Sequence, residues 1–338
     1  MNIIYISGSK IPSKTANSIH VMKMCEAFSE LGHDVKLYVP NLETLDTKIS
    51  NYYDLKYKFE IIKVGKKIKY ITGLKNLIIP LFLVFKSLIN DREKKKVFIT
   101  RNLIVSLILI FSRKKHILEI HDDLNVFGKI VSYIFHKFNL INSKYIIRLI
   151  FITEALKKFI SKKYFFNKKN FIVLPDATEI KYYKNFNLKK KFNIGYIGSI
   201  YQSRGIDTVI NLANKDRDNN YFIYGGSSKE IEKIKFKVKS NNIILHKQVS
   251  YKKIKTVLPK MDILLLPYTK KVTVSGDFGN IYDFMSPMKM FDYLGSGKVI
   301  LSSNVPVLSE VLKNKKNAII IKNSLNVQSW FQEIKKMR

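Results

Sequence analysis

The stretch FMSPMKMFDYLGSGKVILSS, residues 284–303, predicts a loop, a helix, a turn and a buried strand in that order. Ser286 is a favoured N-cap residue, and Pro287 is favoured at the first helical position. The two glycines of LGSG end the predicted helix, and the apolar run 299–301 predicts a short buried strand. The stretch therefore predicts one helix–strand step of a layered α/β domain.

Two charged residues of this helix, Lys289 and Asp292, lie three positions apart and share one face near its start. A helix N-terminus presents free N–H groups and partial positive charge, which favour phosphate, and a lysine in the first turn adds to both. A carboxylate one turn further can accept hydrogen bonds from a pair of sugar hydroxyls. The alternative is a surface ion pair between the two residues, which is common and weak.

The chain has 338 residues, enough for two domains of ordinary size. It is strongly basic, because 60 Lys+Arg against 26 Asp+Glu give a net charge of +34. Such a balance allows nucleic-acid binding, attraction to an anionic membrane, or a coding bias. The basic residues are spread along the whole chain without a separate tail. We therefore favour coding bias with membrane attraction and expect no nucleic acid as partner.

The single cysteine, Cys25, excludes an internal disulfide and a Cys-based zinc site. Residues 1–6 lack the basic n-region of a secretory signal and predict a first strand instead. The longest uncharged apolar runs, 76–85 and 102–112, are shorter than the roughly 18 residues of a spanning helix. We expect a cytoplasmic protein, at most peripheral on the inner face of the cell membrane.

The first half begins with a strand at 3–7, a helix at 19–31 and a strand at 35–39, which is the start of a doubly wound sheet. If the loop before this helix is only a polar turn, Ser18 or Asn17 would cap the helix. The segment 76–88 predicts a helix that is either buried or in contact with a membrane. Further strands are expected at 59–64, 97–101, 117–123, 145–152 and 171–174.

A polar cluster, His121, Asp122 and Asp123, ends the strand expected at 117–123. Ligands of α/β folds bind at the carboxyl ends of strands. His121 could polarise or hydrogen-bond a transferring sugar, and Asp122 could orient its other ring nitrogen. The alternative is a structural histidine. The acids do not form a convergent set for a metal, so no metal site is expected.

The second half repeats the pattern with a strand at 193–197, a tight turn, and a helix that begins near Gly205. We expect the interdomain linker at 181–191. No Gly-x-Gly-x-x-Gly follows the first strand of either half, which argues against a dinucleotide-dependent epimerase or dehydrogenase. Further elements are expected as strands at 221–224, 243–245 and 262–268 and a helix at 327–337.

The octapeptide SPMKMFDY, residues 286–293, resembles a variant of the donor-site motif of family 4 glycosyltransferases. The acid that usually opens that motif is missing, since Phe284 stands in its place and Asp283 lies one residue early. The likeness covers nearly the whole chain to about position 323. It implies the α/β GT-B fold, two doubly wound Rossmann-like domains facing an interdomain cleft, with an acceptor domain at 1–180 and a nucleotide-sugar domain at 181–338.

The resemblance also implies a donor site on this motif. Asp292 would hold the ribose of the nucleotide. Lys289 and the backbone N–H groups near Ser286 and Met288 would hold the diphosphate.

Two loops complete the implied site. Family members carry two cations in the turn after the first strand of the second half, where this chain has Ser199 and then Arg204. A guanidinium binds phosphate well, so Arg204 can fill the second place. Ala16 and Asn17 take the place of a Gly-Gly pair that would face the donor phosphates; the alternative is a plain polar turn. His121, Arg204 and Lys289 are the expected catalytic residues.

The function that follows from the resemblance is retaining, metal-independent transfer of a hexose from a nucleotide-diphosphate sugar. The acceptor would be a glycan or lipid-linked glycan, in cell-surface polysaccharide biosynthesis. The nucleotide-sugar is a substrate, and no cofactor is expected. The alternative is a non-catalytic relative that serves as partner or scaffold, which the missing first acid and Ser199 favour.

Overall fold

The computed structural model describes residues 1–41, 49–65, 75–90, 95–166, 170–180, 190–273 and 280–337. The chain divides into two compact units, Met1–Pro175 and Asp176–Arg338, which we call unit 1 and unit 2. The division lies close to the expected boundary at 180. Most of the expected linker lies outside the described residues, as does the segment 274–279. Each unit is described by itself.

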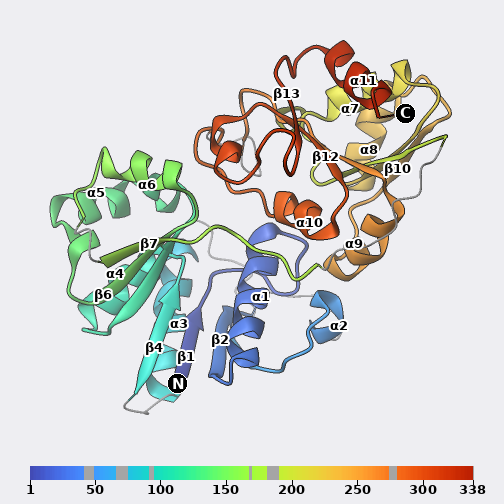
Figure 1. Ribbon diagram of the computed structural model, residues 1–338. Coiled ribbons are helices and arrows are strands. Elements are labelled where there is room, and N and C mark those ends of the chain that lie inside the picture. The colour runs from blue at the N-terminus through green and yellow to red at the C-terminus, as the bar shows by residue number, and fades with distance from the viewer. Residues whose placement is uncertain are drawn as a thin grey trace. The chain divides into compact units, whose positions relative to one another are not determined.

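Unit 1 is built on a parallel sheet of seven short apolar strands (Figure 1). The strands are β1 (Asn2–Ile6), β2 (Asp34–Pro40), β3 (Glu60–Val64), β4 (Lys96–Thr100), β5 (His116–Ile120), β6 (Ile146–Phe151) and β7 (Phe171–Val173). Their order is β3-β2-β1-β4-β5-β6-β7. All the pairings are parallel, as expected for a doubly wound sheet.

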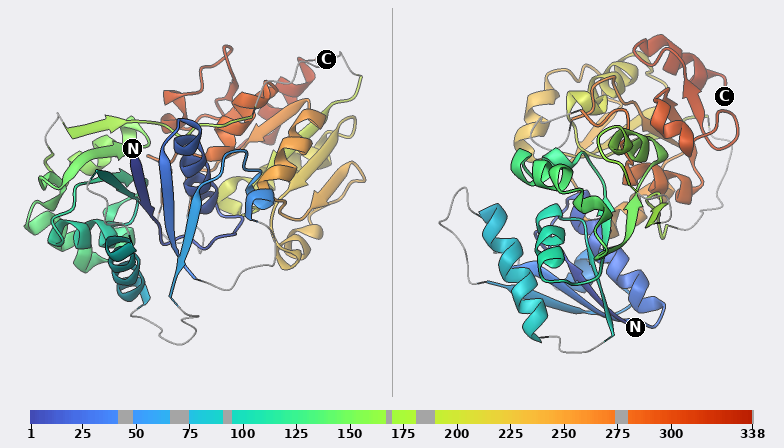
Figure 2. Two further views of the ribbon diagram at one scale, coloured as in Figure 1. Left: turned by 90° about the horizontal axis from the view of Figure 1, so that it is seen from below. Right: turned by 90° about the vertical axis from the view of Figure 1, so that its left-hand side faces the viewer.

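Helices cover both faces of this sheet. They are α1 (Ala16–Glu30), α2 (Ile49–Tyr53), α3 (Lys75–Asn90), α4 (Leu103–Phe111), α5 (Lys129–Lys137) and α6 (Glu154–Ser161). In the right-hand view of Figure 2, α1 and α3 lie on opposite sides of the strands. The alternation of β1 agrees, because Ile4 and Ile6 pack in one cluster with Leu83 and Val84 of α3.

One expectation for the helices of unit 1 needs correction, and a second is left open between its two alternatives. The first helix begins at Ala16 rather than at 19, because the Thr15 hydroxyl caps it by accepting a hydrogen bond from the Ser18 amide. The helix expected at 76–88 is neither wholly buried nor wholly exposed. Leu83 and Val84 are buried, whereas Phe82 and Phe85 are more than half exposed.

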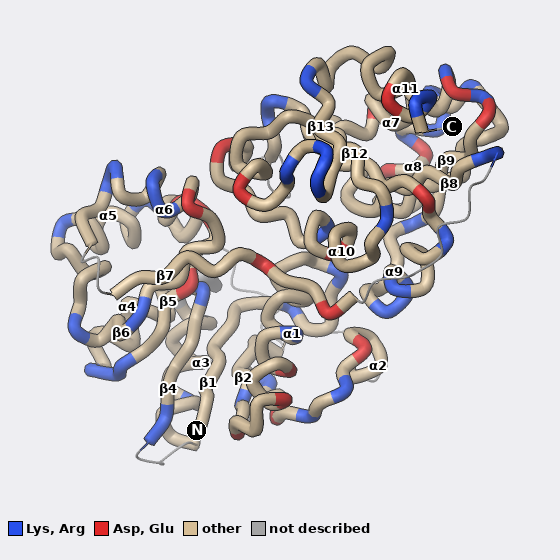
Figure 3. The backbone as a smooth tube through the Cα atoms, viewed as in Figure 1, with Lys and Arg blue, Asp and Glu red and all other residues tan. Residues whose placement is uncertain are grey.

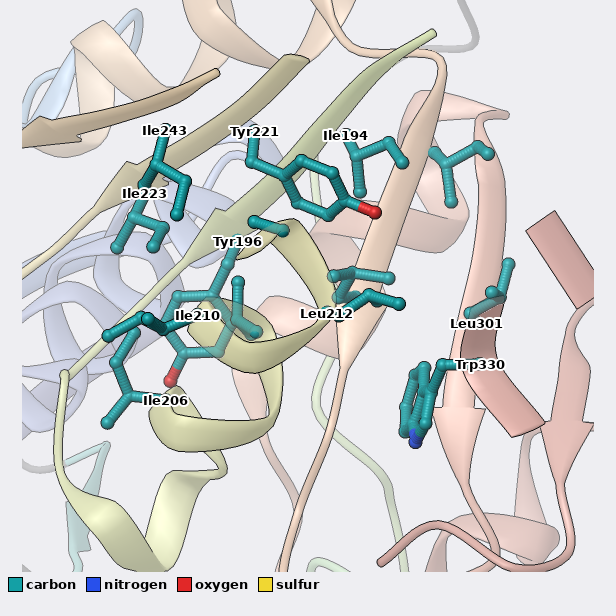
Figure 4. Close-up of a cluster of buried hydrophobic side chains, with 14 of the residues drawn as sticks. Ile194, Tyr196, Ile206, Ile210, Leu212, Tyr221, Ile223, Ile243, Leu301 and Trp330 are labelled. Carbon is teal, nitrogen blue, oxygen red and sulfur yellow. The ribbon is translucent and has the colours of Figure 1, made fainter. Parts of the chain in front are cut away.

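Unit 2 repeats the architecture with a six-stranded parallel sheet in the order β10-β9-β8-β11-β12-β13. Its strands are β8 (Asn193–Ile197), β9 (Asn220–Tyr224), β10 (Ile243–His246), β11 (Ile263–Leu266), β12 (Val299–Ser303) and β13 (Ile319–Ile321). Its helices are α7 (Ile206–Lys215), α8 (Ser228–Lys235), α9 (Tyr251–Val257), α10 (Met288–Ser296) and α11 (Val327–Lys335). Figure 4 shows the core between α7, the sheet and α11, which contributes the fully buried Trp330.

The opening stretch folds as expected in outline, with one correction at the helix start. α10 begins at Met288, and Pro287 occupies the N-cap position in an extended conformation without a side-chain cap. Ser286 therefore precedes the cap instead of forming it. Gly297 ends the helix in the left-handed conformation at φ 66°, which glycine adopts at little cost. Gly295 lies inside the helix.

Candidate functional site

A pair of cations lies at the carboxyl ends of the neighbouring strands β8 and β11. The Lys289 Nζ, in the first turn of α10, lies 4.3 Å from the ring centroid of Tyr196 and 4.8 Å from that of Tyr268. The Arg204 guanidinium lies 5.8 Å from the Tyr268 centroid and donates a hydrogen bond to the carbonyl oxygen of Thr273 at 2.9 Å. Two predicted site residues thus lie beside the same tyrosine ring.

The electrostatics of this pair favour an anion. Burial and the positive charge of Arg204 hold the pKa of Lys289 well below its usual range. Among the described residues, neither cation forms an ion pair with a carboxylate. The expected alternative of an ion pair between Lys289 and Asp292 is therefore wrong. Two neighbouring cations without a counter-charge suit a ligand that carries at least two negative charges.

The backbone closes tightly around these cations. Gly205, at φ 79°, has an ideal Cβ position only 1.6 Å from the carbonyl oxygen of Pro267, so a side chain there would clash with the exit of β11. The Cβ position of Gly198, at φ 151°, lies 3.3 Å from the Lys289 Nζ. Both glycines let the loops approach closely enough to place Arg204 and Lys289 together.

Asp292 lies one turn along α10 and is buried. Its Oδ1 accepts hydrogen bonds from the Thr178 hydroxyl at 2.8 Å and from the Tyr251 hydroxyl at 3.2 Å. Burial raises its pKa to about 6, although these two hydrogen bonds oppose that shift. Asp292 therefore ties α10 to α9 and to the first residues of unit 2. These contacts give Asp292 a structural role, and its contact with a ribose stays a prediction.

The remaining predicted residues of unit 2 differ in exposure. The Ser286 Oγ is buried and has no hydrogen-bond partner among the described residues, although it precedes the helix N-terminus. Met288 is half-buried in the first turn of α10. The side chain of Ser199 is exposed, and its carbonyl oxygen accepts a hydrogen bond from the Tyr196 hydroxyl at 2.6 Å. Ser199 thus holds the ring that lies against Lys289.

In unit 1, the expected catalytic residue His121 belongs to a compact cluster around Glu119. The Glu119 Oε2 lies 3.6 Å from the Nε2 of His121 and 3.4 Å from the Nε2 of His20. The two imidazole rings meet edge to face with centroids 4.7 Å apart. The Tyr5 hydroxyl donates a 2.7 Å hydrogen bond to the same oxygen. Strands β1 and β5 and helix α1 therefore position this cluster together.

Within this cluster, shifted pKa values keep His121 neutral and Glu119 ionised near pH 7. Burial and the nearby Arg101 lower the pKa of His121 to about 4, which keeps the imidazole neutral near pH 7. Burial alone would raise the pKa of Glu119, but the neighbouring imidazoles of His121 and His20 hold it well below its usual range. A neutral imidazole beside a fixed carboxylate can accept or donate a hydrogen bond at a reacting hydroxyl.

The structure also shows the surroundings of three further predicted residues of unit 1, which are Asp122, Ala16 and Asn17. Asp122 was expected to orient His121, but its Oδ1 accepts a hydrogen bond from the Asp123 amide at 2.8 Å. Glu119 is the carboxylate that lies against His121. Ala16 and Asn17 are exposed in the first turn of α1, and neither caps the helix. The sequence analysis did not identify Glu119, although its spacing from His121 puts both on one face of a strand.

The part of the chain that matches a known family is almost coextensive with unit 2. Residues 178–337 match the sequence model of a family described as "Glycosyl transferases group 1". No curated protein sequence matches the chain.

Solved structures resemble the whole chain. Sucrose-phosphate synthase from Thermosynechococcus elongatus superposes with a TM-score of 0.71 at 13% identity over 99% of this chain and 89% of that one. Anabaena Alr3699/HepE, solved with UDP and glucose, gives 0.67 at 12% identity over 99% and 89%. WaaG, a glycosyltransferase involved in lipopolysaccharide biosynthesis, gives 0.66 at 13% identity over 99% and 90%. The chain therefore has the expected GT-B fold, and fold and family match support a transferase.

Proposed function

We propose that this protein is a glycosyltransferase that moves a sugar from a nucleotide-diphosphate sugar to a glycan or lipid-linked glycan. The observation that carries the proposal is the Lys289–Arg204 pair, two cations without a carboxylate partner in the described part of the chain. A diphosphate supplies the negative charge that this pair lacks. The match of residues 178–337 to glycosyltransferases supports the same ligand class.

The chemistry of unit 2 is charge neutralisation. When the bond between sugar and diphosphate breaks, negative charge develops on the leaving phosphate oxygens. Lys289, Arg204 and the N-terminus of α10 are held in place before the reaction and can stabilise that charge. The resemblance to family 4 glycosyltransferases implies retention of configuration and no required metal. Asp292 is proposed to bind the ribose with the carboxylate oxygen that Thr178 and Tyr251 do not contact.

The chemistry of unit 1 is proposed to be orientation of the transferring sugar or of the acceptor hydroxyl. His121 is the group that would make the contact, because it is neutral and partly exposed at the end of β5. Glu119 would act as a positioning residue through His121. Ala16 and Asn17 lie in the first turn of α1, directly after the loop that follows β1, where a bound ligand can reach their backbone.

We also propose that unit 1 contacts an anionic membrane, as a lipid-linked acceptor would require. Lys and Arg are spread over both units, with several on α5 and α6 (Figure 3). Ile130 and Tyr133 of α5 and the adjacent Phe138 are exposed by 77%, 59% and 63%. Lys137 lies over the rings of Tyr133 and Phe138. An apolar face flanked by lysine suits the interface of an anionic leaflet. No helix in the described ranges is long and apolar enough to cross a membrane.

A donor screen tests the function. Purified protein is incubated with single nucleotide-sugars and a polyisoprenoid-linked saccharide acceptor in detergent, and product is detected by mass spectrometry. The proposal predicts addition of one sugar from one donor, lost in Arg204→Ala because the leaving phosphate loses a cation. Nucleotide binding without transfer to any acceptor would favour the non-catalytic relative, a partner or scaffold protein.

A further inference from the structure

The cluster in unit 1 brings together three side chains that bind metals. His20, Glu119 and His121 each offer one ligand atom, and these atoms all lie within 4.8 Å of one another. They come from α1 and from the end of β5, so two packed elements fix their spacing. Both histidines have side chains exposed by 13%, although the Nε2 of His20 itself is buried.

Two of the three separations match those between neighbouring ligands of one ion. The two Nε2 to Oε2 distances, 3.4 Å and 3.6 Å, exceed the usual 2.7–3.2 Å of an N–H···O hydrogen bond. Neighbouring ligand atoms of a tetrahedral zinc site, with bonds of about 2.0–2.2 Å, lie about 3.4 Å apart. We propose that His20, Glu119 and His121 form a Zn²⁺ site and that bound zinc inhibits the transferase. The inhibition rests on the proposed function, whereas the binding does not.

The types of the three ligand atoms indicate which metal the site prefers. Two imidazole nitrogens and one carboxylate oxygen suit zinc and disfavour magnesium, which prefers oxygen ligands alone. Three protein ligands leave a fourth position for water. The Tyr5 hydroxyl donates to the ligating oxygen and would hold the carboxylate in orientation. Zinc on the Nε2 of His121 would replace the contact with Glu119 that orients this imidazole toward substrate, which is why binding would inhibit.

Equilibrium dialysis against zinc chloride tests the site on EDTA-treated protein. We expect one zinc per chain, no competition by excess Mg²⁺, and affinity weakened at least about tenfold in His20→Ala and in Glu119→Gln, since even an outer partner of a metal ligand is typically worth that much. His33→Ala, a half-buried histidine of the same unit, is the matched control and should bind as wild type does. Circular dichroism confirms that each variant is folded. Equal zinc affinity in folded His20→Ala and wild type would overturn the site.

The inhibition has its own readout. In the transfer assay, zinc should abolish product formation and EDTA should restore it. Full turnover at a zinc concentration that saturates the dialysis signal would overturn the inhibition while leaving the site. Because dialysis needs no substrate, absence of transferase activity would count against the proposed function and not against zinc binding.

Discussion

Lys289 is the residue whose environment is hardest to explain without a ligand. Its ammonium lies between two tyrosine rings, and burial together with Arg204 disfavours its charged form. A buried charge that lacks a partner costs stability in the folded protein. Such a cost is typical of binding sites, where the ligand provides the missing charge.

Replacing this lysine should therefore stabilise the protein without ligand. Lys289→Met keeps the length of the side chain and removes the buried charge, so the melting temperature should rise by about 2 °C or more. The loss of the cation–π contacts with Tyr196 and Tyr268 opposes this gain, and we expect the cost of burying the charge to be the larger of the two. Differential scanning calorimetry is the measurement. Lys229→Met, an exposed lysine of α8, should leave the melting temperature unchanged. A lower melting temperature in Lys289→Met would show that the lysine is structural.

His121 offers the second prediction for a single residue. His121→Ala should lower kcat by about 100-fold or more while nucleotide affinity stays within about twofold, because it orients the reaction from unit 1. Glu119→Gln should lower kcat less, since the imidazole remains but its orientation is looser. Steady-state kinetics and nucleotide titration of the same preparations measure both. Equal losses of kcat and nucleotide affinity would identify His121 as structural.

A buried histidine of strand β5, His116, should make folding stability depend on pH in the acid range. Burial lowers the pKa of His116 to about 4 from an ordinary 6.5, and its ring lies between the Ser106 hydroxyl and the Lys114 carbonyl. Between these pH values the unfolded chain binds the extra proton, so folding stability falls as pH drops from 6.5 to 4. The melting temperature of wild type should fall over this window. His116→Gln should show a smaller decrease by circular dichroism, and an identical decrease would contradict the assignment.

Helix α5 is the element that the membrane proposal depends on. Ile130→Glu and Tyr133→Glu should each reduce co-sedimentation with vesicles that contain anionic phospholipid, because each places a charge at the interface. Phe236→Glu is the control, since Phe236 is an exposed apolar residue of unit 2, also beside lysines. Neutral vesicles should bind weakly. Equal binding of all variants to anionic vesicles would exclude this surface.

The elements themselves were largely predictable from sequence. Buried parallel strands are short apolar runs, so β8 was predicted to the residue and most other strands to within a few positions, whereas β13 was not predicted. The helix starts were less predictable. Several residues before α1 are suitable caps, and the sequence does not select among them. In the structure the cap is Thr15. At α10, propensity favours Pro287 as the first helical residue, whereas in the structure Pro287 is the N-cap and the helix begins at Met288.

At the scale of the whole molecule, the sequence indicated two Rossmann-like halves, and the structure has two units with six and seven parallel strands. The family resemblance placed Lys289 and Arg204 in one site, and the structure brings them together. It did not provide Tyr196 or Tyr268, because their contact depends on β8 lying beside β11. Glu119 and His20 were not predicted as site residues for a similar reason, because α1 and β5 are brought together only in the folded unit.

The central claim is that unit 2 binds a nucleoside diphosphate through Lys289, Arg204 and Asp292. Calorimetric titration of UDP, GDP, ADP and CMP without added metal tests it most directly, on wild type, Lys289→Met, Asp292→Ala and the exposed-acid control Glu232→Ala. We predict that one diphosphate binds wild type and Glu232→Ala equally and binds the other two variants at least about tenfold more weakly, because a buried charge or acceptor is lost. Absence of binding to wild type, or equal affinity in all four proteins, would contradict the account.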